Sequence, residues 1–140
     1  MKYEPVRSIG EIQEEILKSS FHKLLSPMPL YFDGGAGSLS IEYRFSDEIE
    51  RQPDTGHWHG GALGALVDVT GFYSIRMLSK SSVTTTHYSV DFMRIANADT
   101  LIATAFVRKL GRSLAFVDVN IAGADRSDVA KGSASYAILN

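Results

Sequence analysis

The sequence contains no cysteine. Disulfide-stapled folds, zinc sites built from cysteine thiolates and cysteine nucleophiles are therefore excluded. The chain also lacks an apolar run approaching the roughly 20 residues that a transmembrane helix needs. Its first segment, Met1–Gly10, lacks an apolar stretch of signal-peptide length. We therefore expect a cytoplasmic protein with no membrane partner, and the absence of cysteine fits a reducing compartment.

An excess of charge of either sign is also missing. The chain has 14 Lys and Arg residues against 16 Asp and Glu residues, a formal net charge of -2. No global field would gather nucleic acid or an anionic membrane, so we expect neither as a partner. What is present is an ordinary globular composition, 44% hydrophobic and 21% charged, which argues against disorder. With 140 residues and no repeat or linker, the sequence predicts one domain over residues 1–140.

The N-terminal part predicts one helix. Ser8 and Glu11 have the spacing of a capping box. Apolar residues then recur at helical intervals, at Ile12, Ile16, Leu17, Phe21, Leu24 and Leu25. We expect a helix over about residues 8–25, which Pro27 and Pro29 would end.

The middle of the chain predicts a turn, a strand, a loop and a buried helix. Asp33–Gly37 is rich in turn residues, and Ser38–Phe45 alternates apolar and polar residues like a strand covered on one face. Residues 47–58 have the composition of a loop. Apolar residues then cover most of the circumference of a helix running from Gly60 to about Ser79. A helix that is apolar all round is a buried one, and this one would be ~30 Å long.

Strand patterns follow the buried helix. The segments rich in β-branched and aromatic residues are Val83–Met93, Leu101–Leu110, Leu114–Ala122 and Val129–Leu139. Turn residues separate them. Such segregation of helices and strands predicts an α+β fold, with an antiparallel sheet curled around one central helix.

Asp68 stands out because it lies in the middle of the buried helix. Burying an ionised carboxylate without a partner costs at least several kcal/mol. The positions one turn away offer no basic residue: they are Gly64, Ala65, Gly71 and Phe72. A purely structural Asp68 would accept hydrogen bonds from a Ser, a Thr or a backbone N–H elsewhere. A carboxylate in a cleft is suited to act as a general base, and we favour this catalytic interpretation.

His59, Gly60 and Gly61 precede or begin the helix. Bare backbone N–H groups at the positive end of a helix have the geometry of an oxyanion hole. Two glycines before a helix are also common in plain turns, so the pattern alone is a weak signal. His57 and His59 could share a face as metal ligands, but Asp54 is the one further ligand nearby. We therefore expect no metal site.

The spacing of Gly60 and Asp68 predicts a dimer. The two residues are eight positions apart, which is ~12 Å along one helix. They cannot act on the same small carbonyl from one subunit. Two such helices lying antiparallel across a two-fold axis would bring Gly60 of one subunit to Asp68 of the other, so we expect a homodimer with shared active sites.

The segment His59–Asp68 resembles the His-Gly-Gly motif and helix of hotdog-fold thioesterases. It is most similar to the phenylacetate-pathway-like branch and its human acyl-coenzyme A relatives. Ser89–Arg94 followed by Asp99–Leu101, and Val107–Ser113, also resemble this family, so the resemblance covers roughly residues 35–140. It implies a hotdog fold, in which a curved antiparallel sheet of five or six strands wraps a long helix. It also implies hydrolysis of acyl-coenzyme A thioesters.

The resemblance assigns roles to individual residues. Asp68 would be the base or nucleophile, and the Gly60 N–H of the partner subunit would polarise the thioester carbonyl. His59 would lie near the thioester, and Gly61 would lie against the substrate. Ser89 matches a serine that positions water or the carboxylate in some relatives. No separate cofactor is implied, since coenzyme A is part of the substrate, and the dimers are expected to pair into a tetramer.

Two positions depart from the family pattern. Pro53 stands six residues before the motif histidine, where many relatives have an Asn or Gln that binds the substrate carbonyl or the water. Gln52 or Asp54 would have to replace that side chain after a shift of the loop. Phe72 stands where some relatives have a Thr, one turn after the acid, and we expect it to contact the substrate.

Arg108, Lys109, Arg112 and Ser113 surround the turn between two expected strands. Most such basic clusters are solvated turns. In the family this region lies near the nucleotide phosphates of the coenzyme, and paired cations suit phosphate groups. We therefore predict that these residues contact coenzyme A.

Two alternatives to a thioesterase stay open. A hotdog dehydratase or hydratase would need an acid–base pair placed against a β-hydroxyacyl chain, and the surroundings of the His-Gly-Gly motif differ from such sites. A non-catalytic acyl-coenzyme A binding module stays open because of Pro53. Release of free thiol from the substrate would separate a thioesterase from both.

Overall fold

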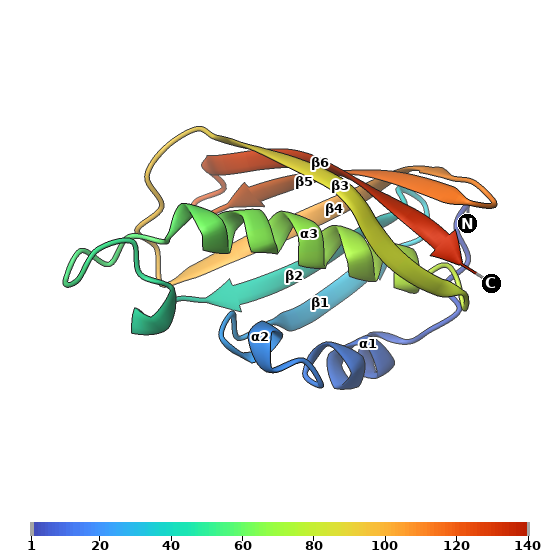
Figure 1. The fold of residues 1–140 in the computed structure, drawn as a ribbon, viewed down its shortest axis with the longest axis horizontal. Coiled ribbons are helices and arrows are strands. Elements are labelled where there is room, and N and C mark those ends of the chain that lie inside the picture. The colour runs from blue at the N-terminus through green and yellow to red at the C-terminus, as the bar shows by residue number, and fades with distance from the viewer. Residues whose placement is uncertain (1, 140) are drawn as a thin grey trace.

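The computed structural model describes residues 2–139, in which a curved sheet encloses one long helix (Figure 1). The helices are α1 (Ile9–Ile16), α2 (Ser20–Lys23) and α3 (Gly60–Arg76), with a short 3-10 helix at Asp47–Ile49. The strands are β1 (Met28–Asp33), β2 (Ser38–Arg44), β3 (Ser82–Phe92), β4 (Thr100–Leu110), β5 (Leu114–Ala122) and β6 (Asp128–Leu139). The predicted α+β arrangement, with an N-terminal helical segment before a wrapped central helix, is confirmed.

The sheet has six strands in the order β1-β2-β4-β5-β6-β3, and all neighbours are antiparallel. This confirms the expected sheet of five or six strands. β3 follows α3 directly along the chain but lies at the edge, paired with β6 alone. An edge strand has one row of backbone groups without a partner strand, so β3 marks the side on which the enclosure of α3 is open. Within residues 2–139, no helix is long and apolar enough to cross a membrane.

α3 is buried on nearly all sides, as its apolar circumference predicts. Glycines let it lie close to the sheet. A Cβ on Gly71 would lie 2.8 Å from Val117 Cγ2 and closer still to the Tyr136 hydroxyl. A Cβ on Gly132 of β6 would lie 2.8 Å from Val67 Cγ1. The helix and sheet therefore meet at a distance that no side chain at these two glycines would allow.

Polar side chains on the buried part of α3 have partners inside the protein. The hydroxyls of Thr70 and Tyr43 are 2.8 Å apart, and Ser74 Oγ donates to the Gly71 carbonyl oxygen at 2.7 Å. Burial raises the pKa of Tyr43 well above its ordinary range, so the phenol remains a hydrogen-bond donor or acceptor in its neutral form. The hydroxyls of Thr70, Tyr43 and Ser74 are thus satisfied without water.

The single helix expected over residues 8–25 is wrong, because the structure has two helices there. Ser19 is extended and caps α2, accepting a hydrogen bond from the His22 backbone N–H at 3.4 Å. A serine that bonds to nearby backbone competes with a continuous helix. The apolar periodicity does not show this break, because it continues across both helices. The capping box of Ser8 and Glu11 is present as predicted.

The prolines at the end of this segment predict only a helix end, whereas the structure has a strand there. β1 pairs with β2, and Pro29 lies opposite Ile41. The sheet therefore begins before residue 35, where the resemblance to the family starts. Proline is tolerated in an edge strand because one side of the strand makes no ladder hydrogen bonds. The position of β1 at the edge, which no local pattern reveals, is what allows Pro29.

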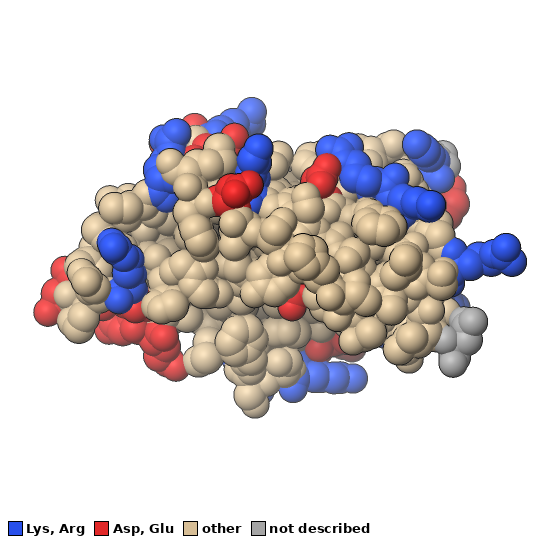
Figure 2. Space-filling view, turned by 45° about the horizontal axis from the view of Figure 1, so that its top comes forward, with Lys and Arg blue, Asp and Glu red and all other residues tan. Residues whose placement is uncertain are grey.

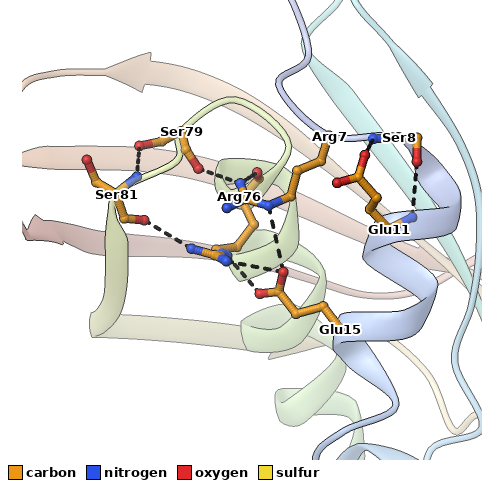
Figure 3. A network of polar contacts seen from close by, with 7 residues as sticks. All are labelled: Arg7, Ser8, Glu11, Glu15, Arg76, Ser79 and Ser81. Carbon is orange, nitrogen blue, oxygen red and sulfur yellow. Dashed lines mark hydrogen bonds and ion pairs between the residues drawn. The ribbon is translucent and has the colours of Figure 1, made fainter.

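Charged side chains hold α1 against the end of α3 (Figure 3). Arg76 of α3 donates to both carboxylate oxygens of Glu15, at 2.8 and 3.1 Å. Arg7 donates to the main-chain carbonyl oxygens of Arg76 and Ser79, the latter at 2.7 Å. A guanidinium at the C-terminal end of a helix also opposes the negative end of its dipole. The N-terminal segment therefore has a fixed position relative to α3.

We predict that Gly71→Ala destabilises the protein by about 1–3 kcal/mol, because the added methyl group overpacks the contact with Val117 and Tyr136. Gly10→Ala is the matched control. Gly10 is an exposed residue of α1, and a Cβ there would meet only Ser8 Oγ, at an ordinary contact distance of 3.8 Å; alanine there should stabilise by roughly 0.5–1 kcal/mol. Urea unfolding curves measure both changes. Equal unfolding midpoints for the two variants would contradict the close packing at Gly71.

Candidate active site

Asp68 lies midway along α3, on the side that faces the edge strand. Its side chain is half-buried rather than enclosed, and it has a threonine partner of the kind that the structural interpretation of Asp68 requires. Thr85 Oγ1 of β3 donates a hydrogen bond to Asp68 Oδ1 at 2.7 Å. Among residues 2–139, the second carboxylate oxygen has no partner. One oxygen is therefore held in place, and the other is available to water or a ligand.

The backbone at Asp68 is fixed from the sheet. Tyr136 of β6 donates from its hydroxyl to the Asp68 main-chain carbonyl oxygen at 2.8 Å. Burial, with a smaller contribution from the charge of Asp68, raises the pKa of Tyr136 well above its ordinary range. The hydroxyl therefore stays protonated and remains a donor. The Phe72 ring packs edge-on against Tyr136, with centroids 6.2 Å apart. Thr85 and Tyr136 together fix the side chain and backbone of Asp68.

A pocket of about 270 Å³ opens beside Asp68 between α2, α3 and β3. The residues that line it with Asp68 are His22, Val69, Phe72, Val83, Thr84 and Thr85. Phe72, which we predicted to contact the substrate, is thus in the same pocket as the carboxylate. The lining thus combines one carboxylate, one imidazole and two threonine hydroxyls with apolar side chains.

The N-terminus of α3 presents one free backbone N–H. His59 Nδ1 accepts a hydrogen bond from the Gly61 N–H at 2.8 Å and so caps the helix. Within the described chain, the Gly60 N–H has no hydrogen-bond partner. Gly60 lies on a second pocket, of about 370 Å³, together with Trp58 and Phe92. An unpaired N–H at the positive end of a helix, next to an apolar pocket, can polarise a carbonyl oxygen.

Gly60 and Asp68 line different pockets, in agreement with their separation along α3. β3 places the Tyr88 side chain beside Gly64 and the Phe92 side chain beside Gly60. These two aromatic side chains are 41% and 55% exposed. Large apolar side chains beside an unpaired strand edge form a surface of the kind that a partner covers.

Ser89, which we expected near Asp68, lies on the other face of the sheet. It pairs with Ser133 of β6, and Ser133 pairs with Asp118 of β5. Cross-strand neighbours share a face, and Ser133 Oγ donates to Asp118 at 3.1 Å on this face. Val117 and Val119, on either side of Asp118, are buried toward α3. The structure therefore does not bring Ser89 to Asp68 within one chain.

Thr85 is the hydroxyl residue beside Asp68, and our sequence interpretation missed it. Thr85 and Ser89 are separated by an even number of positions, so strict alternation would place both on one face. A bulge between Thr85 and His87 adds one residue to β3 and reverses the faces beyond it. The available signal was the run of three threonines, Thr84–Thr86, near the start of β3. The bulge itself depends on pairing with β6, which the local pattern does not contain.

The predicted coenzyme contacts lie on the outer face of the sheet and around the β4–β5 turn. Arg108 Nε is 2.8 Å from Asp118 Oδ2. Such an exposed ion pair contributes only about 0–1 kcal/mol, so it leaves the guanidinium free to exchange partners. Lys109, Arg112 and Ser113 are exposed. These residues are separate from the pocket at Asp68 in the single chain.

Pro53, which replaces the Asn or Gln of the family pattern, lies in the loop before α3. Gln52, Pro53 and Asp54 are all exposed, and none of the three lines the pocket at Gly60, which Arg51 and Trp58 of this loop do. In the described part of the chain, no three His, Cys, Asp or Glu side chains are grouped to hold a metal ion. The Asp68 carboxylate with its hydroxyl donor and the backbone N–H of Gly60 are the groups suited to act on a carbonyl.

The family model of the thioesterase superfamily matches residues 55–130, more than half of the chain. The protein therefore belongs to the thioesterase superfamily. The matched segment includes all of α3 and β3, and with them Gly60, Asp68 and Thr85. No curated protein matches the sequence.

Solved structures of thioesterases share the fold. A thioesterase from Haemophilus influenzae has a TM-score of 0.88 at 15% identity, covering 100% of this chain and 96% of that chain. A mutant thioesterase from Pseudomonas aeruginosa has a TM-score of 0.86 at 18% identity, covering 99% of each chain. The PaaI protein of the phenylacetic acid degradation operon of E. coli has a TM-score of 0.79 at 21% identity, covering 94% and 91%. The hotdog fold and the resemblance to the PaaI-like branch are confirmed.

We predict that Thr85→Val lowers the rate of thioester hydrolysis by about 10- to 100-fold, because a hydrogen bond to a charged group is worth roughly 1.5–3 kcal/mol. Valine keeps the shape of threonine and removes only the hydroxyl. Thr85→Ser keeps the hydroxyl and should restore most of the rate. The measurement is kcat for all three proteins. If serine and valine are equally impaired, the hydrogen bond from residue 85 has no role in the reaction.

Proposed function

We propose that the protein hydrolyses an acyl-coenzyme A thioester to a free acid and coenzyme A, with Asp68 as general base or nucleophile. The observation that carries this proposal is the half-buried Asp68 carboxylate, which lines a pocket with one oxygen held by Thr85 and the other free. A carboxylate fixed in this way is positioned for reaction at a carbonyl carbon.

Two routes give the same products. In the first, Asp68 takes a proton from water as the water oxygen attacks the thioester carbon; the C–S bond then breaks and the proton passes to the thiolate. In the second, Asp68 attacks the carbon itself and expels the thiolate, and water then hydrolyses the mixed anhydride. Both routes place negative charge on the thioester oxygen, so both need a hydrogen-bond donor there.

The donor in this proposal is the Gly60 N–H of a partner subunit. It is unpaired among residues 2–139, and ~12 Å along α3 separates it from Asp68 of the same subunit. A homodimer with antiparallel α3 helices would join the two groups at each of two shared sites. The exposed aromatic residues of β3 support this dimer. In Figure 2 the middle of the visible face is mostly uncharged, and the charged side chains lie toward its margins. Pairing of such dimers would give the expected tetramer.

The remaining site residues have supporting roles in this proposal. His59 keeps the helix N-terminus open by capping Gly61, which leaves Gly60 for the carbonyl. Phe72 lines the acyl side of the pocket. The exposed cations Arg108, Lys109 and Arg112, with the Ser113 hydroxyl, would meet the coenzyme phosphates. Because Arg108 lies on the outer face of the sheet, this contact requires the coenzyme to extend beyond the pocket or to reach another subunit.

We predict that Asp68→Asn lowers kcat by at least about 100-fold, and by up to about 10,000-fold, because the amide has the shape of the carboxylate without its basicity. The measurement is thiol release from a panel of acyl-coenzyme A substrates. A circular dichroism spectrum and a thermal midpoint close to wild type serve as the control for folding. A loss of less than tenfold in folded protein would rule out Asp68 as base or nucleophile.

We also predict that two inactive variants complement each other. Gly60→Pro removes the donor N–H, and proline fits the first position of a helix. His59 is already extended, with φ -65 and ψ 137, which is the conformation that a following proline requires. In a mixed dimer of Asp68→Asn and Gly60→Pro, one site has both groups intact and the other has both defects. Activity per mixed dimer should therefore approach half that of wild type.

The test is to dissociate, mix and reassociate the two variants, with each variant alone treated in the same way. Native mass spectrometry measures how much mixed dimer forms. Mixed dimers that form and stay at the activity of the parents would show that the two groups do not act across a subunit boundary. An active monomer would show the same more directly.

A further inference from the structure

His22 is a polar side chain of the Asp68 pocket that the proposed chemistry does not use. It belongs to α2, and its ring lines the pocket of about 270 Å³ together with Asp68 and Phe72. His22 Nδ1 is 3.0 Å from the main-chain oxygen of Ile16. Because a carbonyl oxygen only accepts, Nδ1 donates this bond. The edge of the ring that carries Nε2 is therefore the one left for the pocket.

Contacts to α3 fix the position of this ring. His22 packs edge-on against Tyr73, with centroids 5.9 Å apart. α1, whose last residue is Ile16, is held to the end of α3 by the paired hydrogen bonds of Arg76 and Glu15 (Figure 3). Tyr73 and Arg76 are on the same helix as Asp68. The separation of His22 from Asp68 is therefore set by the fold.

The Asp68 carboxylate and His22 line the same pocket. A thioester carbonyl at Asp68 has the coenzyme on one side, so the acyl group must extend to the other. Phe72 lies one turn beyond Asp68 in the pocket. His22 packs on Tyr73, which is five positions and thus ~7.5 Å along α3 from Asp68. An acyl group that passes Phe72 therefore meets the His22 ring.

We propose that His22 is a specificity-determining residue that closes the acyl end of the pocket and selects compact acyl groups over long unbranched chains. This inference rests on the proposed function. The N-terminal segment, which lies outside the wrapped helix and sheet, thereby decides which acyl group fits against Asp68.

The test is a profile of kcat/KM over saturated acyl-coenzyme A substrates from acetyl to dodecanoyl. His22→Ala lengthens the pocket, so chains longer than the wild-type optimum should gain at least about tenfold relative to that optimum, the discrimination that a methylene group gives in an apolar pocket. His22→Phe shortens the pocket and should shift the profile toward shorter chains. Lys23→Ala, at an exposed position of the same helix, is the matched control and should leave the profile unchanged.

Opposite shifts distinguish pocket closure from damage to α2. Both His22 variants lose the hydrogen bond to Ile16, so a purely structural effect would shift both profiles in the same direction. An unchanged profile in both variants, or the same shift in both, would overturn the inference while leaving the proposed hydrolysis intact.

Binding gives a readout that does not depend on turnover. In an Asp68→Asn background the acyl-coenzyme A stays intact, and thermal stabilisation by each substrate reports its relative affinity. Adding His22→Ala should move the preference toward longer chains here too. If His22→Ala shifts the binding preference in this way but the wild-type protein releases no thiol, the proposed hydrolysis is refuted and the role of His22 is retained. Absence of both binding and hydrolysis across the panel would overturn both.

Discussion

The structure depends on the enclosure of α3, because a helix that is apolar around its circumference cannot leave a side exposed to water. The sheet curves around it, and Gly71 and Gly132 let the two approach closely. Hydroxyl groups on α3 must then find partners inside the protein, as Thr70 does at Tyr43. An ionisable side chain on such a helix is tolerated only where the enclosure opens, and Asp68 lies at that opening.

The opening follows from the position of β3 at the edge of the sheet. Beyond this strand no further strand covers α3. The bulge in β3 turns Thr85 toward the helix, where it holds Asp68. The same edge leaves Tyr88 and Phe92 exposed. The held carboxylate and the apolar surface beside it thus arise from one topological feature, and in our proposal a second subunit completes the site there by supplying its Gly60 N–H.

The N-terminal segment adds what the wrapped helix does not provide. Arg7 bonds to main-chain carbonyls at and just beyond the end of α3, and Glu15 pairs with Arg76 from the same side. These contacts stabilise the helix terminus and also bring α2 beside the pocket at Asp68. His22 is therefore positioned by its contact with Tyr73, which lies more than one helical turn from Asp68 along α3. The contacts that stabilise the end of α3 therefore also determine the shape of the pocket.

The sequence by itself determined α3, the strands β2 to β6 and the separation of Gly60 from Asp68, because burial on all sides, strand alternation and helical rise are local properties. It also carried the family motif. Only the tertiary structure decided that Pro29 lies in an edge strand and that Thr85, rather than Ser89, meets Asp68. Edge positions and bulges depend on which strands pair across the chain, and one extra residue in a pair reverses every face beyond it. The local periodicity of the sequence does not show which strands pair.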